Sequence, residues 1–135
     1  MKVPHNAHIA VVDGNRFLLM RNTGQMFEPK LGHVENPDLD PTNYSAGIRA
    51  QDEASQRSGS TDLNELAHAA AVAEWLNAKA KVGEINDLII VADPKSLGEM
   101  RHHYHPELKS RLCGELAKTM TGEPTDKIAA ALADA

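Results

Sequence analysis

The sequence feature that most constrains the fold is a pair of apolar runs joined by a tight turn signal near the start of the chain. Residues 8–21 read His-Ile-Ala-Val-Val-Asp-Gly-Asn-Arg-Phe-Leu-Leu-Met-Arg. An Asp-Gly pair between two hydrophobic runs is typical of a β-hairpin. Neither run alternates apolar with polar residues, as it would if one face met water. We therefore predict that both strands lie inside a sheet that other elements cover on its two faces.

A third strand and a long polar loop are predicted after the hairpin. The turn signal Thr23-Gly24-Gln25 leads into residues 26–34, which read as an antiparallel strand. Pro29 places this strand at an edge, because proline cannot donate a hydrogen bond to a ladder. Residues 35–61 are rich in Asn, Asp, Pro, Ser and Gly and show no apolar period. A loop of this length is either functional or disordered.

An alanine-rich helix is predicted next, beginning at Thr61 or Asp62. Asp62 and Glu65 have the spacing of an N-cap and its N3 partner, and the helix is predicted to end at Gly83. We expect Trp75 to pack at the edge of the core. The helix carries one narrow apolar face that can lie close to a sheet, formed by Leu66, Ala69, Ala73, Leu76 and Ala80.

The second half of the chain alternates strands with helices. Residues 88–92 form another run without alternation and follow a helix, so we predict a buried strand parallel to the first. Asp93-Pro94 supplies an N-cap and a first-turn proline for a helix, and His105-Pro106 restarts the helical pattern. A short strand is expected within 113–120 and a last helix over 124–133. This order predicts an α/β fold with a mixed five-stranded sheet in the order 3-2-1-4-5, flanked by helices in a ribonuclease H-like arrangement.

Length and composition favour one domain over residues 1–135 in a reducing compartment. A chain of 135 residues can bury a core large enough to fold without cross-links such as disulfides. Cys113 is the only cysteine, so no internal disulfide can form. The N-terminal residues contain no hydrophobic signal core, and no apolar run is long enough to span a membrane. We expect a cytoplasmic protein without membrane insertion, with export by an unusual route left open.

The acidic residues are concentrated in one region. Residues 35–65 contain seven acids against two arginines, Arg49 and Arg57, so this region alone accounts for the net charge of −5. Proteins bind phosphate backbones mainly through Lys and Arg. The acidic loop is therefore a poor candidate for contact with nucleic acid.

Two acidic residues follow neighbouring strands of the predicted sheet. Asp13 ends the first strand and Asp93 ends the fourth, and Glu65 or Glu74 on the long helix could join them. Gathered carboxylates of this kind hold divalent metals in ribonuclease H-like nucleases. However, Asp-Gly is also a preferred hairpin turn, and Asp before Pro is a preferred helix cap. We interpret both residues as structural, with a metal-dependent nuclease as the alternative.

A second candidate is the run Arg101-His102-His103-Tyr104-His105. His102 and His105 have the i, i+3 spacing of a metal pair on one helix face. No cysteine or carboxylate partner is obvious nearby, so we interpret the run as an exposed basic cluster at a helix break, with ligand or partner contact as the functional alternative. Cys113 shows no sign of thiol activation and is predicted to be a small core residue.

Three parts of the chain together resemble the bacterial host-attachment protein family. They are residues 9–15, which read Ile-Ala-Val-Val-Asp-Gly-Asn, the polar loop before the alanine-rich helix, and residues 88–101, which read Leu-Ile-Ile-Val-Ala-Asp-Pro-Lys-Ser-Leu-Gly-Glu-Met-Arg. Members of that family are described as required for attachment to host cells. The same features are similar to the middle domain of the archaeo-eukaryotic peptide chain release factors. The resemblance implies that fold for nearly the whole chain.

One departure from the release factors bears on activity. In the release factors, the loop before the long helix carries Gly-Gly-Gln, which places a water at the peptidyl-tRNA ester. The matching residues 56–61 read Gln-Arg-Ser-Gly-Ser-Thr, and Thr23-Gly24-Gln25 lies in a strand turn instead. We therefore expect a non-catalytic protein without a cofactor, acting through a protein or ribosome-linked partner.

The residues expected to bind that partner are the two arginines of the loop and three basic residues of the histidine run: Arg49, Arg57, Arg101, His102 and His105. The alternative is an enzyme, either a divergent esterase of the release-factor type or the nuclease using Asp13 and Asp93. The sequence does not give the oligomeric state.

Overall fold

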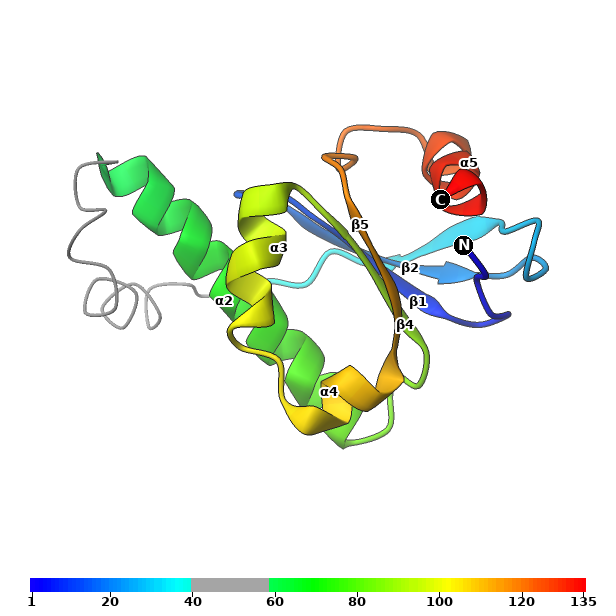
Figure 1. Ribbon diagram of the computed structural model, residues 1–135, viewed down its shortest axis with the longest axis horizontal. Coiled ribbons are helices and arrows are strands. Elements are labelled where there is room, and N and C mark those ends of the chain that lie inside the picture. The colour runs from blue at the N-terminus through cyan, green and yellow to red at the C-terminus, as the bar shows by residue number, and fades with distance from the viewer. Residues whose placement is uncertain (40–58) are drawn as a thin grey trace.

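The computed structural model describes residues 1–39 and 59–135, with the side chains of residues 59–62 left out. Figure 1 shows how the elements are arranged. The strands are β1 (His8–Val12), β2 (Phe17–Asn22), β3 (Leu31–Glu35), β4 (Leu88–Ala92) and β5 (Leu112–Ala117). The helices are α2 (Gly59–Lys81), α3 (Pro94–Arg101), α4 (Pro106–Arg111) and α5 (Thr125–Asp134). None of these helices combines the length and apolar character needed to cross a membrane.

The strands form one five-stranded mixed sheet in the order β3-β2-β1-β4-β5. β1 pairs with β2, and β2 with β3, in the antiparallel sense, whereas β4 runs parallel to both β1 and β5. The predicted order is confirmed. Its centre is the hairpin strand β1, in which Ile9, Ala10, Val11 and Val12 are fully buried.

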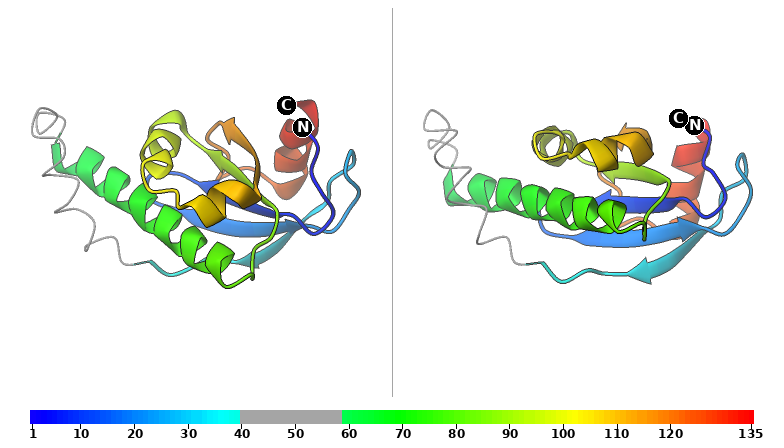
Figure 2. Two further views of the ribbon diagram at one scale, coloured as in Figure 1. Left: turned by 60° about the horizontal axis from the view of Figure 1, so that its bottom comes forward. Right: turned by 90° about the horizontal axis from the view of Figure 1, so that it is seen from below.

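Both faces of the sheet are covered, as the runs without alternation predict. Ala10, Val12 and Ile90 face a core that they share with α2, α3 and α4. Ile9 and Val11 face a second core that contains the N-terminal segment and α5. Figure 2 shows α5 beside the N-terminus and apart from the other helices. The Met1 amino group donates a hydrogen bond to the carbonyl of Ala135, so both ends of the chain meet on this side.

The long helix α2 packs on the sheet through its alanine stripe. Ala69, Ala73, Leu76 and Ala80 are fully buried, as predicted, and small side chains allow the helix axis to lie close to the sheet. Leu66, the first residue of the predicted stripe, is only half-buried and packs in a separate small cluster with Ala67 and Ala70. Trp75 packs at the edge of this core, where its ring meets that of Phe17 edge-to-face with the centroids 5.3 Å apart.

Gly83 ends the helix. It adopts a φ of 79°, in the left-handed region that glycine enters without strain. The backbone N–H of Glu84 then donates to the carbonyl of Lys79 and satisfies one of the last carbonyls of α2.

The structure corrects several predicted boundaries. α2 begins at Gly59, so Asp62 and Glu65 lie inside the helix and are not its cap. β3 spans Leu31–Glu35 at the edge of the sheet, and Pro29 precedes it. The connection between β3 and α2 is therefore 36–58, shorter at both ends than the predicted loop. β5 ends at Ala117, three residues before the predicted range does.

Candidate functional site

The first candidate site lies where β1 and β4 end. Val12 pairs with Ala92 in the parallel register, so the next residue of each strand, Asp13 and Asp93, follows at the same edge of the sheet. The prediction that these two residues occupy neighbouring strand ends is confirmed. Whether either carboxylate can bind a metal depends on how many hydrogen bonds its oxygens already accept from the protein.

Asp13 is held by its own turn. Its Oδ1 accepts hydrogen bonds from the backbone N–H of Asn15 and of Arg16, each at 2.7 Å. Its Oδ2 accepts from Arg16 Nε at 3.1 Å and from the hydroxyl of Thr121. Partial burial raises the pKa of the carboxyl, but the hydrogen bonds from Thr121, Asn15 and Arg16 outweigh burial and bring the pKa below its ordinary value. Asp13 is thus ionised at neutral pH, with both oxygens engaged.

Asp93 caps α3, as predicted. Its Oδ2 accepts a hydrogen bond from the backbone N–H of Ser96 at 3.0 Å, and Pro94 follows in the first turn. The other oxygen, Oδ1, is buried and has no hydrogen-bond partner among the residues that the structure describes. One oxygen of Asp93 is therefore structural, and the other is enclosed.

The two glutamates that could have joined them lie in different places. Glu65 Oε2 lies 3.6 Å from Lys95 Nζ, near the strand ends. Glu74 Oε1 lies 3.6 Å from His105 Nε2, beside the link between α3 and α4. Within residues 1–39 and 59–135, no three His, Cys, Asp or Glu side chains gather into a group that could hold a metal ion. The geometry gives no support to the nuclease alternative.

Gly14 lets α2 approach the hairpin turn closely. A Cβ atom at this position would lie 2.5 Å from Cγ of Glu65, far inside contact distance. One turn further along α2, the His68 ring donates a hydrogen bond to the backbone of Asp13. The turn after β1 is therefore held against the first described turns of α2.

A polar cavity of about 340 Å³ opens beside this contact. Three segments meet around it: the hairpin turn, the residues after β3, and α2. Its polar groups come from two amides, a carboxylate and an imidazole, and Phe17 and Leu39 supply apolar surface. The lining residues are Gly14, Asn15, Phe17, Pro37, Asp38, Leu39, Asn64 and His68.

His68 is the residue of this cavity whose protonation is perturbed. Burial lowers its pKa, and the hydrogen bond to the Asp13 backbone, together with the Asp13 charge, only partly opposes this. The imidazole is therefore neutral at pH 7. Its Nδ1 atom is buried and finds no hydrogen-bond partner among the described residues.

A second cavity, of about 470 Å³, lies between α5 and the turn from β2 to β3. It is mainly apolar, and Phe27 at its edge is 67% exposed. Its lining includes Phe27, Pro29, Leu31, Ala129, Ala130 and Ala133. The turn signal Thr23-Gly24-Gln25 lies in the same connection, as predicted.

The predicted basic cluster lies in the link between α3 and α4. His102 is the C-cap of α3 and His105 is the N-cap of α4, so the two residues do not share a helix face. The i, i+3 metal spacing is therefore wrong, because Pro106 restarts the helix instead of continuing it. The interpretation as a cluster at a helix break is confirmed.

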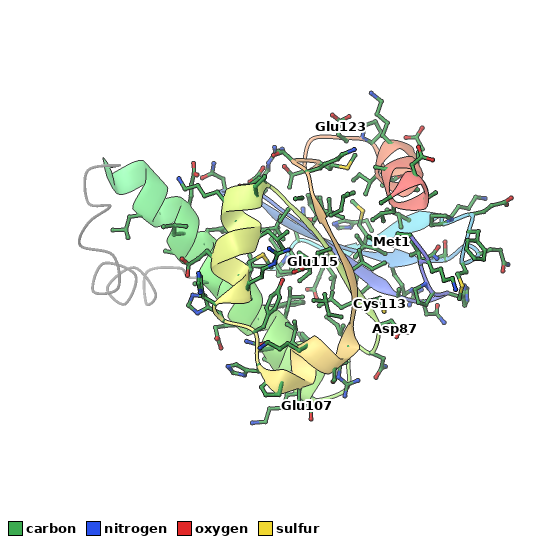
Figure 3. The ribbon with its side chains drawn as sticks, viewed as in Figure 1. Met1, Asp87, Glu107, Cys113, Glu115 and Glu123 are labelled. Carbon is green, nitrogen blue, oxygen red and sulfur yellow. The ribbon has the colours of Figure 1, made fainter. Side chains whose placement is uncertain are left out.

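Carboxylates of the same chain lie beside this cluster, contrary to the prediction, and three of its side chains pair with them. Arg101 Nη2 lies 2.8 Å from Glu115 Oε1, and the Tyr104 hydroxyl donates to Glu115 Oε2 at 2.8 Å. Figure 3 labels Glu115 on β5, beside α3. His103 Nε2 lies 2.7 Å from Glu99 Oε2, and His105 pairs with Glu74. Arg101 and His105, both predicted binding residues, are thus cross-links within the fold.

Cys113 is exposed, and its prediction as a core residue is wrong. It lies near the start of β5, at the register shift where Leu88 pairs with Leu112 and Ile89 pairs with Gly114, so Cys113 has no partner in the β4–β5 ladder. Figure 3 shows Cys113 near Asp87, and Sγ lies 3.7 Å from Asp87 Oδ1. Partial burial and the Asp87 charge raise the pKa of the thiol, which leaves it a poor nucleophile.

Two of the predicted binding residues, Arg49 and Arg57, lie outside the described residues. Sequence reasoning also missed residues that the structure brings to the site: Asp38, Asn64, His68 and Thr121. His68 alone carried a local signal, as a titratable residue beside the alanine stripe of α2. Thr121 reaches Asp13 across 108 residues of sequence, and no local pattern reports such a contact.

The sequence model of bacterial archaeo-eukaryotic release factor family 12 matches residues 6–132 of this chain. The match covers nearly the whole chain and confirms the predicted relation to the release factors. It carries no statement about attachment to host cells. Among curated proteins, none matches the sequence.

Proposed function

This chain belongs to bacterial archaeo-eukaryotic release factor family 12, and we propose that it is a non-catalytic member that acts by binding a protein partner linked to the ribosome. The observation that carries the proposal is the connection between β3 and α2. Residues 36–58 contain a single glycine, Gly47, and no Gly-Gly-Gln. Without that tripeptide, the chain lacks the residues with which release factors place a water at the peptidyl-tRNA ester.

The strand-end carboxylates support a binding role over hydrolysis. Asp13 accepts four hydrogen bonds from the protein itself, and Asp93 caps α3. The lone pairs of Asp13 are directed at those donors, which makes it a poor metal ligand and a poor general base. Asp93 uses one oxygen to cap α3, and its other oxygen is buried.

The sequence of the connection supports it as the contact segment. It follows the edge strand β3 and precedes α2, whose first turns extend past the sheet in Figure 1. Within it, Arg49 and Arg57 are the only cations among several acids. An arginine can bind a carboxylate through two parallel hydrogen bonds, so a directional contact to an acidic partner would use these two residues. Such a protein would act in the cytoplasm, and any effect on attachment to host cells would be indirect.

The binding proposal is tested by replacing both arginines. The Arg49→Ala/Arg57→Ala variant and the intact chain are compared for co-sedimentation with ribosomes from the native cell and for thermal stability. A Lys81→Ala/Lys118→Ala variant is the matched control, because it removes the same charge from two exposed lysines elsewhere. We expect the arginine variant to lose co-sedimentation at an unchanged melting temperature while the lysine variant keeps it. Equal co-sedimentation of all three proteins would contradict the proposal.

The absence of catalysis is tested separately. The intact chain is incubated with peptidyl-tRNA, and with RNA in the presence of magnesium, and the products are measured. We expect neither peptide release nor cleavage above the rate without protein. Either activity, if Asp13→Asn abolished it, would establish the enzyme instead.

A further inference from the structure

The edge of the sheet at β3 offers backbone hydrogen-bonding groups to a further strand. Among the described residues, β3 pairs only with β2 and forms one border of the sheet (Figure 2). Leu31 pairs with Asn22 of β2. The backbone of Asn22 bonds to the other side instead, through its N–H to Ala7 and its carbonyl to Asn6. The N–H and C=O of Leu31 therefore point away from β2, and by alternation so do those of His33.

Exposed apolar side chains gather at the same edge. Four large hydrophobic side chains of the described residues are exposed, and three of them, Met26, Phe27 and Val34, lie on β3 or in the turn before it. The fourth, Val82, follows α2, and the other edge strand, β5, contributes none. Because clustered apolar side chains on a surface mark sites of interaction, β3 is the favoured edge for a partner.

The charges along β3 are those of a strand that complements itself. Lys30 immediately precedes β3, Glu35 is its last residue, and both are exposed. Lys79 of α2 also lies within electrostatic range of Glu35, but its ammonium pairs with Glu84 at 2.8 Å. In an antiparallel pair of identical strands, the basic end of each copy meets the acidic end of the other, twice by symmetry. Opposite charges facing each other across two strands stabilise their pairing.

The register places these two charges on one face of the sheet. Glu35 pairs with Leu19, which belongs to the core shared with α2. Leu31 packs against the opposite core, which contains α5. Since side chains alternate along a strand, Lys30 lies on the α2 face as Glu35 does. The two residues can therefore meet across an interface between two copies of β3.

We propose that β3 pairs with β3 of a second copy of this chain, antiparallel and around a two-fold axis at Gly32. Leu31 of each copy then exchanges backbone hydrogen bonds with His33 of the other, and Lys30 of each copy approaches Glu35 of the other. A register shift after His33 forms a bulge, which ends the regular ladder, so the new pairing is short and the dimer is weak. This inference goes beyond the proposed function and does not depend on it.

The experiment is sedimentation velocity of the full chain over a wide range of concentrations. We expect a sedimentation coefficient that rises with concentration toward that of a dimer. Lys30→Glu and Glu35→Lys should each weaken association about tenfold or more, because two pairs change from attraction to repulsion. A mixture of these two variants restores opposite charges at both ends and should form a heterodimer. Lys118→Glu changes the charge of an exposed lysine elsewhere and should associate as the intact chain does.

Hydrogen exchange locates the interface. The amides of Leu31 and His33 should exchange more slowly at high protein concentration than at low concentration, while those of β5 should not change. Thermal unfolding checks that each variant is folded, and we expect unchanged melting temperatures because Lys30 and Glu35 are exposed. A chain that is monomeric at every concentration, a Lys30→Glu variant that associates undiminished, or a mixture no more associated than its components would each overturn the proposal. Concentration-dependent protection at β5 in place of β3 would overturn it as well.

Discussion

Replacing Asn22 should destabilise the protein strongly, because this side chain is a buried hydrogen-bond hub. Asn22 lies on β2 and is completely buried. Its Oδ1 accepts hydrogen bonds from the backbone N–H of Gly24 at 2.8 Å and of Lys30 at 3.0 Å. Its Nδ2 donates to the carbonyl of Val3 at 3.0 Å, with Pro4 at 3.3 Å and Gln25 at 3.4 Å as longer contacts. One amide thus joins the N-terminal segment to the turn between β2 and β3.

The magnitude follows from the three bonds no longer than 3.0 Å. Each hydrogen bond contributes about 1 kcal/mol net, so Asn22→Ala loses about 3 kcal/mol of the free energy of unfolding. Backbone N–H groups left without an acceptor would raise the loss toward about 5 kcal/mol. Asn22→Asp keeps the acceptor but turns a carboxylate oxygen toward the three carbonyls. We expect it to cost at least as much at neutral pH, with a smaller deficit in acid, where a protonated carboxyl regains a donor.

The assay is urea unfolding followed by circular dichroism. For a slope of about 2 kcal/mol/M, a loss of 3 kcal/mol moves the midpoint by about 1.5 M. Asn64→Ala is the control, because Asn64 is exposed on a helix and its replacement should change stability by less than about 0.5 kcal/mol. An Asn22→Ala variant within about 1 kcal/mol of the intact protein, with an unchanged slope, would refute the reasoning by showing that water replaces the side chain.

Three further predictions concern the sheet and its hairpin turn. Val11→Asp and Ile90→Asp each place an unpaired carboxylate at a fully buried position. Each should cost several kcal/mol of the free energy of unfolding, which is about enough to unfold the protein. A soluble variant that unfolds cooperatively would contradict the sheet order. The pKa of Asp13 is lowered in the folded protein, so its stabilising contribution is present above its ordinary pKa of 3.8 and is lost as pH falls through the lower folded value. Acid titration of stability should be flatter in Asp13→Asn, and parallel curves would contradict this. Gly14→Ala should cost about 1–3 kcal/mol through its clash with Glu65, and adding Glu65→Ala should restore most of the loss; a double variant as unstable as the single one would count against that contact.

The sheet could be predicted because its determinants are local. Runs such as 88–92 lack alternation only when both faces are covered, and a helix between two such runs implies a parallel crossover. The start of β3 could not be predicted in the same way. Residues 26–30 belong to a turn organised by Asn22, and their apolar members Met26 and Phe27 are exposed. Apolar character alone therefore suggested a longer strand than the backbone hydrogen bonds allow.

The candidate site was only partly within reach of sequence reasoning. The adjacency of Asp13 and Asp93 follows from the parallel register, which the sheet order fixes. The cavity could not be predicted from the sheet order, because it forms where Asp38, after β3, and His68 of α2 meet the hairpin turn. Cys113 was misplaced for a related reason. A small residue beside Leu112 suggests a core position, but the register shift that leaves Cys113 between the pairs Leu88–Leu112 and Ile89–Gly114 is visible only in the tertiary structure.

The cross-links around the histidine run decide where a partner would bind if Arg49 and Arg57 proved dispensable. Buried Asn77 of α2 donates to the carbonyl of His103 at 2.8 Å and accepts from the N–H of His105 at 3.0 Å. The link between α3 and α4 is thereby fixed to α2, while Glu115 holds Arg101. A partner that used Arg101 or His105 would have to break these pairs. A partner contact at this link would therefore act against interactions that hold the fold together.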